Sequence, residues 1–179
     1  ILGCGGVDHN EQMRIKYQRA PITTEWTVGA KANTGDGIVA AEKLGAALEL
    51  MEDAWWGPTV PLVGRPWFAL NERNSPGSVI VNQAGKRFMN ESMPYVEAGH
   101  HMYGGPYGQG PGPGENVPCW LVFDQQYRDR YIFAGLQPGQ RIPQKWLDSG
   151  VVVSAGSIAE LAKKTGVPAA DLAVTVERF

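Results

Sequence analysis

The sequence has few cysteines and no excess of positive charge. Cys4 and Cys119 are its only cysteines, far apart and outside any C-x-x-C spacing, so neither a disulfide framework nor a zinc site is predicted. Sixteen Lys and Arg residues against eighteen Asp and Glu residues give a net charge of -2, which offers no positive field for phosphate backbones or anionic lipids. We therefore expect a protein of the reducing cytoplasm that does not bind nucleic acid.

Long apolar runs, a charged leader and an initiating methionine are also missing. No apolar stretch approaches the roughly 20 residues that a membrane-spanning helix needs, and no export signal precedes Ile1. We expect no membrane span, and we expect the chain to be a fragment of a longer protein. Its hydrophobic content of 43% is ordinary for a globular domain and too high for a disordered segment.

Helices are expected near both ends of the chain. Their ranges are 11–19, 34–48, 157–164 and 169–179. Asn10 is a suitable N-cap for the first helix, and Ser157 with Glu160 three residues later forms a capping box for the third. Small residues within the second helix indicate close packing on another element.

The middle of the chain is expected to hold strands, short helices and a long loop. The strands are 78–81, 86–89, 119–123 and 151–153, and the short helices are 124–131 and 145–148. The first two strands form a β-hairpin around Gly85, and Ser92 caps a helix that ends near Tyr103. Ten of the fifteen residues from Gly104 to Pro118 are Gly or Pro, which predicts a loop. We predict an α+β fold.

Two patterns that could mark a ligand site are weak. The run Gly3-Cys4-Gly5-Gly6 resembles a dinucleotide fingerprint, but its last glycine is missing and no complete strand precedes it. It is either a turn near a cofactor or a plain turn. His100 and His101 are neighbours, so on a helix they point about 100° apart and cannot share one metal ion. We predict no metal site.

Tyr95 is the candidate catalytic residue. Five of the six tyrosines lie between positions 95 and 131, a clustering that by itself is equally typical of core packing. Tyr95, however, falls in the first turn of the helix that ends near Tyr103, where free N–H groups and the helix dipole favour a phenolate over a phenol. That position predicts a general base.

Glu91 and Arg87 precede this helix and are four residues apart. The spacing is typical of a surface ion pair. The functional alternative is that Glu91 and Arg87 orient the site or form part of a proton path.

Aromatic residues are dense between positions 55 and 68 and are interrupted by prolines, which favours strands or loops over helices. We expect Trp55 and Trp56 in the core and Phe68 in the wall of a pocket. Tyr103, at the far end of the helix that begins near Tyr95, is a second candidate for contact with a substrate.

Several runs of residues resemble one family of flavoenzymes. The runs are Thr34-Gly35-Asp36-Gly37-Ile38, Ala54-Trp55-Trp56-Gly57-Pro58, Pro76-Gly77-Ser78-Val79-Ile80-Val81-Asn82, Asn90-Glu91-Ser92 and Pro94-Tyr95. In them the sequence resembles the middle of FAD-dependent 3-ketosteroid Δ1-dehydrogenases. The N-x-x-G-x-R-F-x-N-E pattern from Asn82 to Glu91 is shared more widely, with the fumarate reductase and succinate dehydrogenase flavoprotein superfamily.

This resemblance implies a domain organisation. Residues 1–52 would be the last piece of a Rossmann-like FAD-binding domain, with Gly5, Gly6 and Asp36 near FAD. Residues 53–179 would form the catalytic domain that covers the substrate. The missing segments of the flavin domain would be partners of this fragment, which we expect neither to retain FAD nor to be active alone.

The resemblance also implies a reaction. In the family, a tyrosine that matches Tyr95 takes a proton from C2 of a 3-ketosteroid while the flavin accepts a hydride from C1. Phe68 and Tyr103 would then contact the steroid.

Other functions remain open at this point. Fumarate reductases place an arginine shortly after the Asn-Glu pair, where this sequence has Met93-Pro94-Tyr95, an apolar and phenolic segment that suits a steroid better than a dianion. A related FAD-dependent ene reductase or dehydrogenase is the next alternative. A noncatalytic binding cap is an alternative of a different class.

Overall fold

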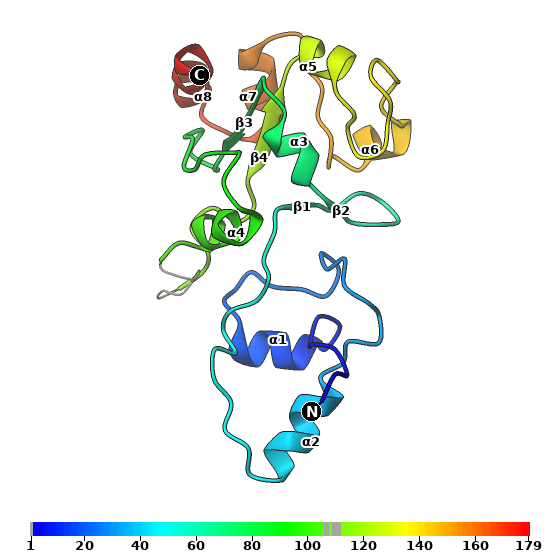
Figure 1. Ribbon diagram of the computed structural model, residues 1–179. Coiled ribbons are helices and arrows are strands. Elements are labelled where there is room, and N and C mark those ends of the chain that lie inside the picture. The colour runs from blue at the N-terminus through cyan, green and yellow to red at the C-terminus, as the bar shows by residue number, and fades with distance from the viewer. Residues whose placement is uncertain (1, 106–107, 109–111) are drawn as a thin grey trace.

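Two groups of elements are visible in Figure 1, a small lower part with α1 and α2 and a larger upper part with all the others. This computed structural model describes residues 2–105, 108 and 112–179. Its elements are α1 Glu11–Tyr17, α2 Asp36–Lys43, β1 Thr59–Val60, β2 Trp67–Phe68, α3 Leu70–Asn74, β3 Ser78–Val81, α4 Tyr95–Tyr103, β4 Trp120–Phe123, α5 Gln125–Arg130, α6 Gln144–Asp148, α7 Ile158–Thr165 and α8 Ala169–Arg178. Helices and short antiparallel sheets together agree with the expected α+β class.

The lower part consists of two short helices and irregular segments. The side chain of Asn10 accepts a hydrogen bond from the Met13 N–H, as expected of a cap for α1. The helix expected over 34–48 is α2, which ends at Lys43 and has no buried residue. The prediction that it packs closely on another element is therefore wrong within this chain. Leu44, just after it, is 89% exposed.

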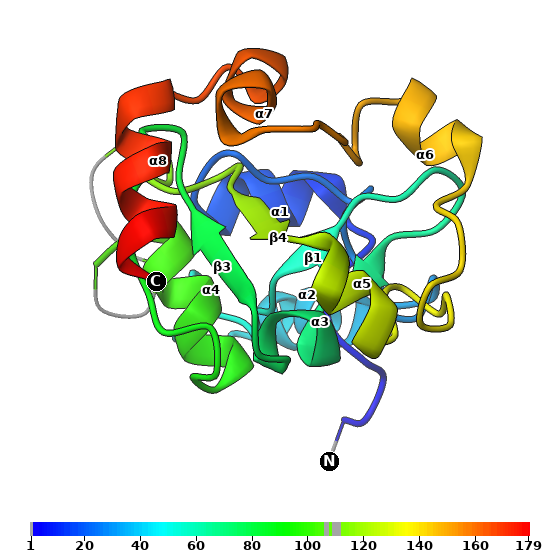
Figure 2. The ribbon, with the colours of Figure 1, turned by 90° about the horizontal axis from the view of Figure 1, so that it is seen from above.

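The upper part is built around β3 and β4. Their register pairs Ser78 with Phe123, Val79 with Val122, Ile80 with Leu121 and Val81 with Trp120. Because successive side chains of a strand point to opposite faces, Val79 and Val81 pack with Leu172 of α8, while Ile80 packs with Ala98 of α4. Figure 2 shows α8 and α4 beside β3.

A further apolar cluster lies toward the other edge of the upper part. It contains Leu62, Tyr127, Phe133, Ala134 and Trp146. The phenol of Tyr127 donates a hydrogen bond of 2.7 Å to the Glu72 carbonyl, which ties α5 to α3. The short sheet β1–β2 borders this cluster, because Val60 and Trp67 pack against it.

The hairpin expected over 78–89 forms only at its turn. The Gly85 N–H donates to the Asn82 carbonyl at 2.9 Å, the Asn82 N–H donates to the Lys86 carbonyl at 3.0 Å, and Val81 bridges Arg87. Beyond that bridge, β3 pairs with β4, and residues 86–89 form no strand. The Ile80 N–H donates to the Glu91 carboxylate at 2.9 Å, so a side chain occupies the strand edge that residues 86–89 would need.

Two other local predictions are wrong. α4 begins at Tyr95 after Pro94, with no side-chain cap, and the Ser92 N–H is bound to the Asn90 side chain at 2.9 Å. The strand expected at 151–153 is irregular, because the Val152 N–H donates to the carbonyl of Trp146. At the C-terminal end, Ser157 caps α7 as expected by accepting from the Glu160 N–H.

Arg19 joins the two parts. Its guanidinium donates to the carbonyls of Tyr103 at 2.5 Å and Gly104 at 3.0 Å, and to those of Gly112 at 2.7 Å and Pro113 at 2.9 Å.

The loop expected between 104 and 118 is irregular where it is described, and the remainder lies outside the described residues. No described helix is both long and apolar enough to cross a bilayer.

Candidate active site

A cavity of about 1500 Å³ lies between the two parts. The lower part contributes Gly6, Asp8 and Arg14 to its wall, and the upper part contributes Trp56, Phe68 and Tyr103. The part of the wall that comes from residues 50–60 is largely apolar. A cavity of this size and lining can hold a polycyclic apolar ligand together with a larger group.

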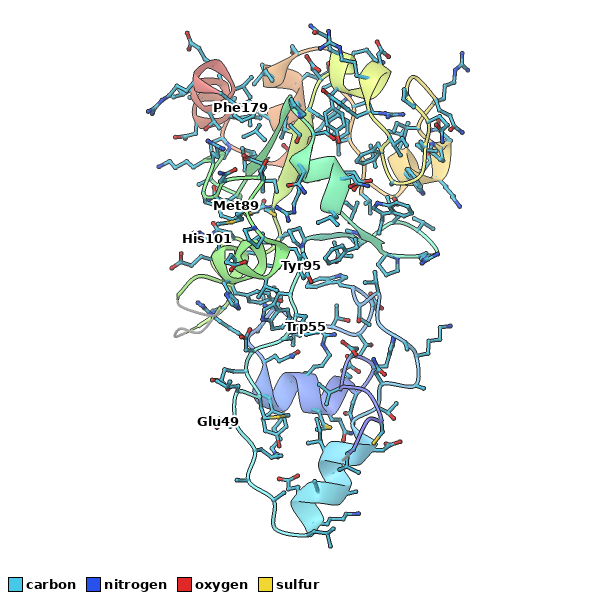
Figure 3. All side chains as sticks on the ribbon, viewed as in Figure 1. Glu49, Trp55, Met89, Tyr95, His101 and Phe179 are labelled. Atoms are coloured by element: carbon cyan, nitrogen blue, oxygen red, sulfur yellow. The ribbon has the colours of Figure 1, made fainter. Side chains whose placement is uncertain are left out.

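Tyr95 is the first residue of α4 and lies beside this cavity. Its side chain is 38% exposed, and Figure 3 shows it at the waist of the molecule. The ring meets Phe68 edge-on, with centroids 5.5 Å apart and planes at 77°. Phe68 lines the cavity, whereas Tyr95 borders it through this contact. The phenol is thus placed at the positive end of a helix and against an apolar wall.

The Trp-Trp-Gly-Pro segment makes room for Phe68. A Cβ at Gly57 would lie 2.0 Å from Cε2 of Phe68, so only glycine allows the ring to take this place. Trp56 donates from its indole N–H to Asp53 at 3.0 Å. Trp55 is 90% exposed, so its expected place in the core is wrong for this chain.

Tyr103, at the other end of α4, is buried. Its hydroxyl donates a hydrogen bond of 2.6 Å to the Pro21 carbonyl, and its ring lies 5.3 Å from that of Trp56. Burial raises the pKa of Tyr103 to about 12. Tyr103 therefore acts here as a neutral hydrogen-bond donor that joins the two parts, with its ring in the cavity wall.

Glu91 and Arg87 form an ion pair, as their spacing predicts, but the Glu91 carboxylate is buried and does not lie on the surface. Glu91 is 4% exposed, and Arg87 Nη2 lies 2.6 Å from its Oε2. Burial by itself would raise the pKa of Glu91, but the hydrogen bonds from Arg87 and from the Ile80 N–H outweigh it and lower the pKa below its ordinary value. Neither side chain lines the cavity. Their role in a proton path or in site orientation stays a prediction.

Gly5, Gly6 and Asp36 come together in the lower part. Gly5 has φ +82°, and a Cβ there would lie 2.2 Å from Oδ1 of Asn33. The Gly6 carbonyl accepts from the Gly35 N–H at 2.9 Å, which sets the glycine turn beside the start of α2. Asp36 is exposed and accepts from the Thr34 hydroxyl at 3.1 Å. Their role in cofactor binding stays a prediction.

Several residues at the cavity carry no signal in the sequence. Arg14 is 8% exposed, and its Nε and the Oε1 of Gln18, the C-cap of α1, are buried without a hydrogen-bond partner among the described residues. Arg73 is 2% exposed and also lines the cavity. No spacing or motif singles out these side chains, because their burial depends on contacts between distant segments.

His100 and His101 occupy different environments. His100 Nε2 lies 2.9 Å from Asp53 Oδ1, which links α4 to the segment before Trp55. His101 is exposed on the same helix, as Figure 3 shows. Across the described residues, no group of three His, Cys, Asp or Glu side chains is arranged to hold a metal ion.

Comparison with known proteins relates the whole chain to flavoproteins. A family model described as FAD binding domain matches residues 1–179. A 3-oxosteroid 1-dehydrogenase of Mycolicibacterium smegmatis is 83% identical over 179 residues, and one of Mycobacterium tuberculosis is 82% identical over the same length. Both alignments cover 100% of this chain, which spans 32% of the length of each relative.

A solved structure shares the fold. The crystal structure of 3-ketosteroid delta1-dehydrogenase from Sterolibacterium denitrificans in complex with 1,4-androstadiene-3,17-dione matches with a TM-score of 0.88 and 40% identity. The match covers 98% of this chain and 31% of that chain. The elements described above are therefore arranged as in the corresponding third of that protein.

Proposed function

The chain belongs to the FAD binding domain family, and on that premise we propose that it is part of a flavin-dependent dehydrogenase that desaturates the C1–C2 bond of 3-ketosteroids. The observation that carries the proposal is the placement of Tyr95 at the start of α4, edge-on to Phe68 in the wall of a large apolar cavity. The 83% identity to a 3-oxosteroid 1-dehydrogenase supports the same reaction.

The residues of the lower part fit one wall of an FAD site. The glycine turn brings backbone close to the cavity, and the Nε of Arg14 and the Oε1 of Gln18 are buried polar atoms that no group in the described part of the chain satisfies. Gly6, Asp8, Arg14 and Gln18 would hold FAD on this side, with Gly5 shaping the turn. When bound, FAD supplies the acceptor for the hydride from C1.

Tyr95 removes the proton from C2 in this proposal. The C3 ketone acidifies C2, so that a base beside C2 can remove its proton. Phe68 provides an apolar surface against which the steroid rings lie, and Tyr103 keeps the opposite end of α4 fixed on the lower part.

We further propose that residues 1–52 belong to the FAD-binding domain and residues 53–179 to the substrate-covering domain. The three apolar clusters, which all lie after residue 59, support this division.

The two free cysteines agree with a place in the reducing cytoplasm.

The test is a Tyr95→Phe substitution in the full-length protein, assayed by dye-coupled oxidation of an androstenedione-like 3-ketosteroid. Loss of the base is expected to lower kcat by at least about 100-fold, with FAD still bound. Tyr17→Phe, which changes a phenol outside the cavity wall, is the matched control and should retain activity. Near-normal turnover by the Tyr95 variant would remove Tyr95 as the base, and reduction of fumarate without steroid oxidation would overturn the reaction.

The isolated chain of 179 residues gives a second test. One wall of a cofactor site does not provide the contacts of a complete one, so we expect this chain to purify without flavin absorbance and without activity. A yellow, active preparation would contradict that expectation and leave the reaction itself untouched.

A further inference from the structure

Arg73 is a buried cation in the cavity wall. It lies on α3, is 2% exposed, and takes part in none of the ion pairs found among the described residues. Burial lowers its pKa. Burying a guanidinium without a carboxylate partner costs desolvation free energy, which hydrogen bonds to other groups must offset. The hydrogen-bond acceptors of Arg73 therefore indicate its role.

Those partners are the backbone carbonyls that lead into α4. Arg73 Nη1 donates to the carbonyl of Glu91 and to that of Met93, the latter at 2.7 Å. Met93 is two residues before Tyr95, and Pro94 is the only residue between them. The guanidinium thus fixes the turn from which Tyr95 emerges.

The side chain of Glu91 fixes the same turn from the other side. Its carboxylate accepts from the Ile80 N–H of β3 and from Arg87. This anchor sets the beginning of the turn, at residue 91, whereas Arg73 also reaches residue 93. Of these two anchors, Arg73 therefore binds the backbone closer to Tyr95.

The segment that carries Arg73 also contacts the ring of Tyr95. Phe68, at the end of β2, is separated from α3 by Ala69 and packs edge-on against Tyr95. The continuous segment from Phe68 to Arg73 thus holds Tyr95 at two points, the ring through Phe68 and the backbone through Arg73.

We propose that Arg73 is a positioning residue for Tyr95. By binding the carbonyls of residues 91 and 93, it sets the backbone at the start of α4 so that the phenol stands against Phe68 in the orientation that proton abstraction needs. Displacement of a base by about 1 Å is enough to lower a rate about 100-fold. The inference rests on the proposed function, in which Tyr95 is the base.

The experiment uses the full-length flavoprotein with Arg73→Met, Arg73→Lys, Tyr95→Phe and the double variant Arg73→Met/Tyr95→Phe. Arg130→Met, on the exposed surface of α5, is the matched control. We expect Arg73→Met to lower kcat by about 10- to 100-fold, with KM for the steroid and FAD content within threefold of the parent. Arg73→Lys keeps a cationic N–H donor and should recover at least part of that loss.

Single-turnover reduction of the flavin in the Tyr95→Phe background separates positioning from general packing. If Arg73 acts through Tyr95, adding Arg73→Met to Tyr95→Phe should cost less than twofold, because effects of residues that act as a unit do not add. An equal loss in both backgrounds would overturn the proposal, as would parental kcat in Arg73→Met.

If Arg73→Met does not fold with FAD, Arg73→Gln, which removes the charge and keeps an amide donor, replaces it in both backgrounds. Parental kcat in Arg73→Gln, or an equal loss of rate with and without Tyr95→Phe, would reject positioning. Activity retained by Tyr95→Phe alone would instead remove Tyr95 as the base, the part of the proposed function on which this inference rests, so the two failures are distinguishable.

Discussion

The two parts of the molecule differ in what holds them together. The upper part has three apolar clusters and a sheet whose β3 residues are all buried. In the lower part, α2 has no buried residue, and Leu44 and Leu50 are 89% and 64% exposed. Because most helical stability in proteins comes from packing of an apolar face, the lower part depends on groups beyond itself.

This difference shows which contacts stabilise each part of the molecule. The upper part carries its own core, so its elements stabilise one another. The lower part is held by the Asn10 cap, by hydrogen bonds between its loops and by Arg19, all of which are polar contacts.

The largest effect is expected in the core of the upper part. Leu172 is 1% exposed and packs between α8 and β3. Leu172→Ala should lower the free energy of unfolding by about 3 kcal/mol, because it removes buried methyl groups and leaves a cavity. Urea denaturation measures this loss. Val174→Ala, on the same helix but 52% exposed, is the control, and equal losses for the two variants would mean that this cluster does not stabilise the upper part.

The buried carboxylate of Glu91 should have the next largest effect. Glu91→Gln is expected to cost about 2 kcal/mol at pH 7, because it removes a charged acceptor of buried hydrogen bonds. Glu97→Gln, an exposed change on α4, should cost much less.

The same carboxylate predicts a pH dependence with a definite sign. The pKa of Glu91 is lowered in the folded state from the ordinary value of 4.5, so its contribution is present above that value and is lost as the pH falls through the lower folded pKa. Stability curves of the parent and of Glu91→Gln should converge as the pH is lowered below 4.5. Curves that remain parallel there would contradict the shift.

Arg19→Met tests the junction between the two parts. Removing a cation that binds several carbonyls should cost about 2 kcal/mol, and the loss should be local, since no apolar cluster depends on Arg19. Limited proteolysis should become faster within residues 20–52 while the upper part stays protected. Lys31→Met, exposed in the same part, is the control. Uniform cleavage along the chain would show that the parts unfold together.

The smallest effect is expected at a helix cap. Ser157→Ala should destabilise α7 by about 1 kcal/mol, because the Glu160 N–H loses its acceptor. Ser92→Ala, at a position where the sequence predicts a cap that the structure does not have, should be close to neutral in the same urea assay. A larger loss at Ser92 than at Ser157 would reverse this assignment of caps.

Local features could be predicted from the sequence because they depend on a few neighbouring residues. Asn10 and Ser157 each cap a helix within three residues of themselves. The glycine and proline content after Tyr103 marks the loop for the same reason. The expected helix has Tyr95 in its first turn, and α4 begins at Tyr95, although the cap expected at Ser92 is wrong.

The hairpin and the second helix show why the rest could not be predicted. Residues 78–89 have the composition of a hairpin, yet the Glu91 side chain takes the edge of β3, and the partner strand comes from about 40 residues further along the chain. The small residues of α2 indicate a packing surface, but no residue of α2 is buried by the part of the chain that the structure describes.

The sequence by itself determined the class of fold, the helix caps at Asn10 and Ser157, the long loop and the relation to flavoenzymes, because dihedral preferences, caps and motifs act over short distances. Only the tertiary structure decided that Arg73 binds carbonyls 18 and 20 residues away and that Arg19 joins the two parts. It also decided that the Tyr103 hydroxyl donates a hydrogen bond to the Pro21 carbonyl. The physical reason is that burial of a charge or a phenol is a property of its surroundings, and those surroundings are assembled from segments distant in the chain.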